Sequence, residues 1–84
     1  MTYDQMTIEE LQLKKEKLLD EINSLNNEIN EDRDLIENDR FMHYTDRKEL
    51  ENEIVFYHLQ INKIKSEITI IEESIAKRVV KKLN

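Results

Sequence analysis

Residues 50–79 read LENEIVFYHLQINKIKSEITIIEESIAKRV, and their apolar side chains recur at alternating steps of four and three residues. The members of this series are Leu50, Ile54, Tyr57, Ile61, Ile64, Ile68, Ile71 and Ile75. Because an α-helix has about 3.6 residues per turn, this spacing gathers the series into one stripe along one helix face. Such a stripe is stable in water only when another helix covers it. The stretch therefore predicts a long helix packed against a partner helix.

The first half of the chain contains a second stripe with the same spacing. Its members are Ile8, Leu11, Leu18, Ile22, Leu25, Ile29 and Ile36. Lys15 and Asp32 occupy two positions of this stripe where an apolar residue is expected. Thr7 precedes the stripe and Glu10 follows three residues later, which is the spacing of a capping box at a helix start. The pattern predicts a first helix that begins at Thr7.

The two stripes do not share one heptad frame, so the chain between them either turns or continues as one helix with a stutter. In an antiparallel hairpin, the numbers of facing residues add to a constant. Six apolar pairs, from Leu11 and Ile75 at one end to Ile36 and Leu50 at the other, share the constant 86. This agreement favours the hairpin.

We therefore predict an all-α fold, a long antiparallel two-helix coiled-coil hairpin that forms a single domain over residues 1–84. The predicted elements are a helix at about 7–39, a turn at about 40–45 and a helix at about 46–82. Thr45 or Asp46 is the expected cap of the second helix. The alternative is a purely structural parallel coiled-coil oligomer, in which one continuous helix runs through residues 40–46.

The composition limits the class of protein. Eighty-four residues allow one small domain, and the absence of Gly and Pro removes the usual turn residues of β and α/β folds. Without Cys there is no disulfide framework, which is compatible with a reducing cytosol. The acidic N-terminus does not resemble a signal peptide, and no apolar run is long enough for a membrane span. We expect a cytoplasmic protein, and the abundance of Glu, Ile, Lys and Asn suggests a low-GC bacterium or a phage as its source.

The net charge of −6 is unevenly distributed. Residues 1–42 carry five basic and twelve acidic side chains, a net charge of −7, and residues 43–84 carry eight basic and seven acidic, a net charge of +1. This contrast favours contact between the two halves, and the overall sign argues against a nucleic-acid partner. The one basic cluster consists of Lys77, Arg78, Lys81 and Lys82. We interpret it as a cationic helix end that faces the acidic N-terminus. A nucleic-acid-associated accessory protein that uses this cluster is the alternative.

The chain offers few residues for catalysis or metal binding. His43 and His58 are its only histidines, and neither belongs to an HExxH or a Glu-x-x-His motif. No serine has a neighbouring His and Asp in a nucleophilic arrangement, and no Gly-rich phosphate loop exists. We therefore expect no enzyme activity, no catalytic residues, no metal and no cofactor.

Several large apolar residues fall outside both stripes. Those that the hairpin places near its turn are Phe41, Met42, Val55, Phe56 and Leu59. We predict that these five form a protein interface, with Phe56 as its anchor, because exposed apolar patches usually mark binding surfaces. We expect the hairpin to dimerise through such residues into a four-helix arrangement, or to bind a different protein whose identity the sequence does not give.

The sequence thus predicts a non-enzymatic protein-interaction module, such as a small adaptor, assembly factor or inhibitor. We expect a homodimer with a further protein partner and no membrane partner.

Overall fold

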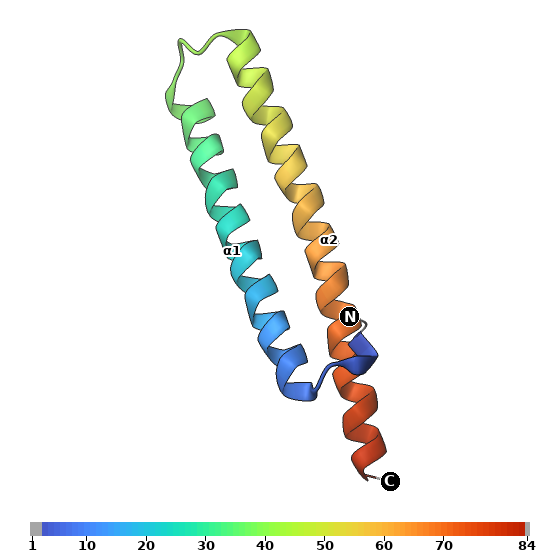
Figure 1. The fold of residues 1–84 in the computed structure, drawn as a ribbon. Coiled ribbons are helices and arrows are strands. Elements are labelled where there is room, and N and C mark those ends of the chain that lie inside the picture. The colour runs from blue at the N-terminus through green and yellow to red at the C-terminus, as the bar shows by residue number, and fades with distance from the viewer. Residues whose placement is uncertain (1–2, 84) are drawn as a thin grey trace.

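Two long α-helices run antiparallel in the computed structural model of the chain (Figure 1). Helix α1 spans Ile8–Asn38 and helix α2 spans Tyr44–Leu83. A short 3-10 helix, η1, spans Tyr3–Gln5 and lies beside the C-terminal part of α2 (Figure 1). The structure describes the backbone of residues 3–83 and the side chains of residues 3–81. The rod extends 64 × 19 × 16 Å along its principal axes, and the predicted antiparallel hairpin is confirmed.

The core is the contact between the two predicted stripes. Its buried members are Leu11, Leu18, Ile22, Ile29, Ile61, Ile68 and Ile71. Partly buried side chains extend the core in both directions, namely Tyr3, Met6, Leu25, Ile54, Tyr57, Ile64 and Ile75. Burial of this apolar area is the main favourable contribution to the free energy of folding, because a solitary helix of either length gains little in water.

One seam residue is less buried than its position suggested. Ile64 lies in the middle of the series in residues 50–79, but it is only half-buried and lines a surface groove with Leu25 and Lys63. Ile71, two layers further along, is 0% exposed.

Thr7 caps α1 as predicted. Its hydroxyl accepts a hydrogen bond from the Glu10 backbone N–H at 3.1 Å, and the Glu10 carboxylate accepts one from the Thr7 N–H at 3.4 Å. Each of these bonds satisfies a backbone donor that the helix itself leaves without an acceptor.

The chain turns over residues 39–43 without Gly or Pro and without a positive φ angle in its described part. Asp39 makes the turn: its N–H donates to the Leu35 carbonyl at 3.1 Å, and its carboxylate accepts from the Phe41 N–H at 3.1 Å. A carboxylate that binds the backbone two residues on replaces the conformational freedom that a glycine would supply. The alternative prediction, in which one continuous helix runs through residues 40–46, is therefore wrong.

The start of α2 also differs from the prediction. The helix begins at Tyr44, and the His43 carbonyl accepts the first helical bond from the Arg47 N–H at 3.0 Å. Thr45 and Asp46, the expected caps, lie within the first turn instead. Asp46 still places a negative charge there, which favours the positive end of the helix dipole.

The pair Ile71 and Ile64 tests the burial of the seam. We expect Ile71→Ala to lower the free energy of unfolding by ~2–5 kcal/mol, because it leaves a cavity in a fully enclosed layer. Ile64→Ala removes the same atoms from a half-exposed position and should cost clearly less. Urea titration followed by circular dichroism measures both. Equal losses for the two variants would contradict the described difference in burial.

Candidate functional site

The side of α2 that points away from α1 carries a patch of large apolar side chains. Two residues of a helix advance by about 200°, so Leu59, which lies midway between the seam residues Tyr57 and Ile61, points away from α1. Val55 and Phe56 flank it one turn earlier, and all three are exposed. We call this side the outer face of α2, and these three residues the outer patch. The patch lies on a continuous helix that the seam holds in place.

Phe56 is held by its neighbours although 55% of it is exposed. Its ring centroid lies 6.3 Å from that of Tyr57, with an angle of 53° between the ring planes. The Tyr57 hydroxyl donates to the Glu53 carboxylate at 2.6 Å. The pKa of Tyr57 is raised to about 12. The hydrogen bond to the Glu53 carboxylate is the main cause, because it favours the neutral phenol, and partial burial contributes less. Phe56 thus packs beside an aromatic side chain that is itself anchored.

The turn carries the other two predicted interface residues. Phe41 is 97% exposed, whereas Met42 is half-buried. Phe56 comes twelve residues after the start of α2 at Tyr44, which corresponds to about 18 Å along the helix axis. The structure therefore brings Val55, Phe56 and Leu59 together, and places Phe41 and Met42 on a separate surface at the end of the rod.

The outer face of α2 contains further apolar residues that we did not assign to the interface from the sequence. Ile70 and Val80 are both exposed on this face. The sequence signal was present, because Phe56, Leu59, Ile70 and Val80 all lie on a second series with steps of three and four. Polar residues interrupt this series, so its apolar members do not stand out as a stripe in the sequence.

The corresponding outer face of α1 is polar. Asp20 lies midway between the seam residues Leu18 and Ile22, and the side chains above and below it are mostly acidic. The exposed polar residues of this face are Glu9, Glu16, Asp20, Asn27, Glu31 and Asp34. Leu13 is the one large apolar side chain there. The two outer faces of the rod therefore differ in chemistry, and only that of α2 suits an apolar partner.

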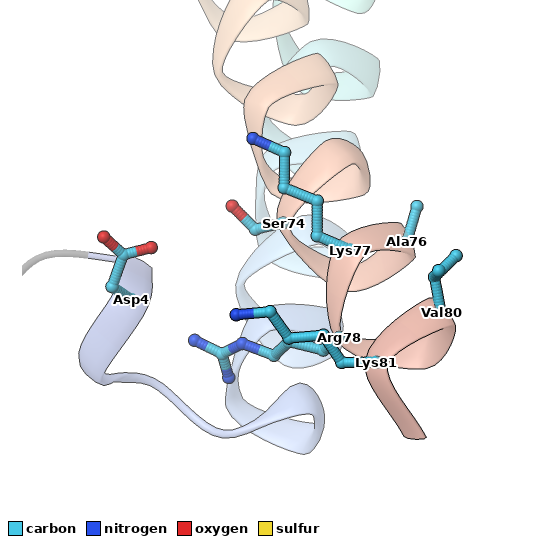
Figure 2. Close-up of a pocket in the computed structure, with 7 residues that line it drawn as sticks. All are labelled: Asp4, Ser74, Ala76, Lys77, Arg78, Val80 and Lys81. Carbon is cyan, nitrogen blue, oxygen red and sulfur yellow. The ribbon is translucent and has the colours of Figure 1, made fainter. Parts of the chain in front are cut away.

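Three members of the basic cluster, Lys77, Arg78 and Lys81, border a groove between η1 and the last turns of α2 (Figure 2). The Arg78 guanidinium donates to the backbone carbonyls of Met6 and Tyr3, the latter at 2.7 Å. Arg78 therefore holds the N-terminal segment on the rod. Lys77 and Lys81 line the same groove, and the side chain of Lys82 lies outside the described residues. The cluster serves the hairpin through its only arginine.

Both histidines, His43 and His58, lie on the exposed surface of the hairpin. The Arg33 and His58 side chains approach across the hairpin, with Nη2 and Nε2 3.5 Å apart, on its exposed side. Among the described residues, no three His, Asp or Glu side chains come together in a way that could hold a metal ion.

Neither α1 nor α2, over the residues described, has a stretch with the length and apolarity that a bilayer crossing requires.

Asp32 is the buried carboxylate of the seam. It is 7% exposed, and its Oδ2 atom has no hydrogen-bond partner. Burial raises the pKa of Asp32 above its usual value of 3.8, and the negative charges of Glu53 and Glu31 raise it further. The folded state therefore binds this proton more tightly than the unfolded state does. Stability from this group is greatest at low pH and is lost as the pH rises through the raised pKa.

Replacement of Asp32 tests this assignment. We expect Asp32→Leu to raise the free energy of unfolding at pH 7 by ~1–3 kcal/mol, because it removes a buried charge and extends the apolar seam. The gain should be smaller at pH 4.5, because the raised pKa of Asp32 moves this carboxyl towards its neutral form as the pH falls. Urea titrations at both pH values measure the difference.

Asp34→Leu is the matched control, since it removes the same charge from an exposed position on the same helix. We expect it to change the stability by less than ~0.5 kcal/mol at either pH. A loss of stability in Asp32→Leu at both pH values would show that Asp32 makes a favourable interaction in the core.

No protein-family model matches the chain, and neither the curated proteins nor the solved structures contain a significant match.

Proposed function

We propose that this chain is a non-enzymatic protein-interaction module and that the outer face of α2 is its main binding surface. The observation that carries the proposal is the exposure of Val55, Phe56 and Leu59 as one contiguous apolar patch on a rigid helix. Exposed patches of this kind mark interfaces, and aromatic residues concentrate binding energy within them. Such a module acts as a small adaptor, assembly factor or inhibitor, because each of these roles depends on a surface that binds another protein.

Dimerisation of two hairpins into a four-helix arrangement belongs to the same proposal. A two-helix rod covers one stripe of each helix and leaves the remaining surface wet. Pairing of two rods through α2 removes the outer patch of each from water, and burial of one Phe side chain is worth ~1.5–3 kcal/mol. The turn, where Phe41 is exposed, then remains available for a different protein.

The substitution Phe56→Asp tests the proposed surface. We expect it to preserve the helical signal in circular dichroism, because Phe56 lies outside the seam. It should shift the molecular mass measured by light scattering from dimer towards monomer, since a charge replaces the anchor of the patch. A dimer that becomes monomeric supports the outer face as the interface.

Leu13→Asp is the matched control. Leu13 is 54% exposed, nearly the same as Phe56, but it lies on the polar outer face of α1. The same charge at this position should leave the mass unchanged. If Phe56→Asp and Leu13→Asp behave alike across the concentration range, the outer face of α2 is not an interface.

A further inference from the structure

The outer face of α2 carries a second heptad stripe that extends well beyond the outer patch. It starts at Phe56 and reaches Val80 through alternating steps of three and four residues, and we call it the outer stripe. Its apolar members are Phe56, Leu59, Ile70 and Val80, all exposed. Between them lie Lys63 and Glu73, which are also exposed and carry opposite charges. The stripe thus has apolar positions near both ends, the opposite charges of Lys63 and Glu73 inside, and a further cation, Lys77, one step before Val80.

This arrangement is complementary to itself when it is reversed. If a second outer stripe is laid antiparallel on the first, with Ser66 facing Ile70 at the centre, Lys63 of each chain faces Glu73 of the other. In the same register Phe56 of each chain faces Val80 of the other. The dimer would therefore contain two opposite-charge pairs inside two apolar pairs.

We propose that the partner of the outer face is a second copy of this chain, bound antiparallel through α2 with Lys63 opposite Glu73 of the other copy. This inference rests on the proposed function and specifies the partner and the register of the interface. The assembly is a row of four helices in the order α1, α2, α2, α1, with the two turns at opposite ends.

Other pairings of the same stripe are less favourable. A parallel dimer sets Lys63 against Lys63 and Glu73 against Glu73, and like charges across an interface are costly. An antiparallel dimer shifted by one heptad sets Phe56 against Glu73, which exposes the largest apolar side chain to a carboxylate. Binding of the stripe to the outer face of α1 places apolar residues against Asp20 and its acidic neighbours. The Lys63–Glu73 register avoids all three conflicts.

The charges of the outer stripe are not satisfied within the hairpin. The one ion pair among the described residues joins Lys15 to Glu72, at 3.4 Å, and it lies beside the seam. Lys63 and Glu73 are both exposed in the single chain, and Lys63 borders the groove that Ile64 and Leu25 also line, so both charges can reach another molecule. In the proposed dimer, Lys77 of one chain lies opposite Leu59 of the other. The aliphatic stem of Lys77 can cover the leucine while its ammonium stays in water.

The size of the contact sets the expected affinity. The stripe covers 24 residue steps, or about 36 Å of helix, and a helix is only ~10–12 Å wide. This footprint is small beside the ~800 Å² that each partner buries in a standard interface. We therefore expect a reversible dimer whose population depends on concentration in the micromolar range.

Cysteine crosslinking tests the register, and the chain contains no other Cys. Helix axes about 9–10 Å apart bring directly facing Cα atoms to roughly 4.4–5.4 Å, within disulfide range. A mixture of Lys63→Cys and Glu73→Cys chains should form a covalent dimer under oxidation. Lys63→Cys alone should not, because its two copies lie about 15 Å apart along the axis. Self-crosslinking of Lys63→Cys as efficient as that of the mixture would overturn the antiparallel register.

Charge reversal gives a second, independent readout. In Lys63→Glu both pairs become Glu–Glu, and in Glu73→Lys both become Lys–Lys, so each variant should weaken its dimer by about tenfold or more. An equimolar mixture of the two forms opposite-charge pairs again and should recover the original affinity. Sedimentation velocity over a concentration series measures all three samples.

The outcomes separate the register from the proposed function. If Phe56→Asp abolishes the dimer while the charge variants and their mixture match the natural chain, the surface is correct and the register is overturned. If Phe56→Asp has no effect on mass, the proposed function fails as well. Weakening by both reversals with recovery in the mixture supports the proposed dimer.

Discussion

The structure depends on one constraint, which is that each helix carries an apolar stripe that only the other helix covers. The side chains of Leu11 in α1 and Ile71 in α2 are both 0% exposed. They lie towards the same end of the enclosed core. Neither helix would persist alone in water, since most helical stability in proteins comes from packing of such a face. The turn, the caps and the N-terminal segment all act by keeping these two stripes in contact.

The ends of the seam show how the chain completes a core that two helices leave open. Helix α2 continues past the start of α1, and η1 folds back beside α2 near that point (Figure 1). Tyr3 and Met6 pack against the core there, and Arg78 holds the carbonyls of both residues. At the other end Asp39 binds the backbone of the turn. Arg78 and Asp39 thus stabilise the two ends of the rod, which a larger helical fold would cover with additional helices.

Much of this fold could be predicted from the sequence because it is periodic. The spacing of the isoleucines gave both helices, the numbering constant gave the antiparallel pairing, and Thr7 with Glu10 gave the start of α1. The start of α2 was less accessible, because the Asp39 turn relies on side chain and backbone geometry that has no strong sequence signature. The half-burial of Ile64 was not accessible from periodicity alone, because the repeat places Ile64 and the fully buried Ile71 in the same stripe. Asp32 was recognised as an interruption of the stripe, but its unpartnered oxygen and raised pKa depend on the positions of Glu53 and Glu31.

The shared register of the two helices also restricts how the gene can change. Deletion of a single residue within α1 would rotate every later side chain by about 100° and turn the remaining stripe away from α2. A lineage can therefore gain or lose single residues in the turn, where no stripe is displaced. Within the helices, length can change only by matched heptads, one in each helix, and each such step lengthens the rod by about 10 Å. The hairpin is therefore a spacer whose length can change in heptad steps while the seam keeps its register.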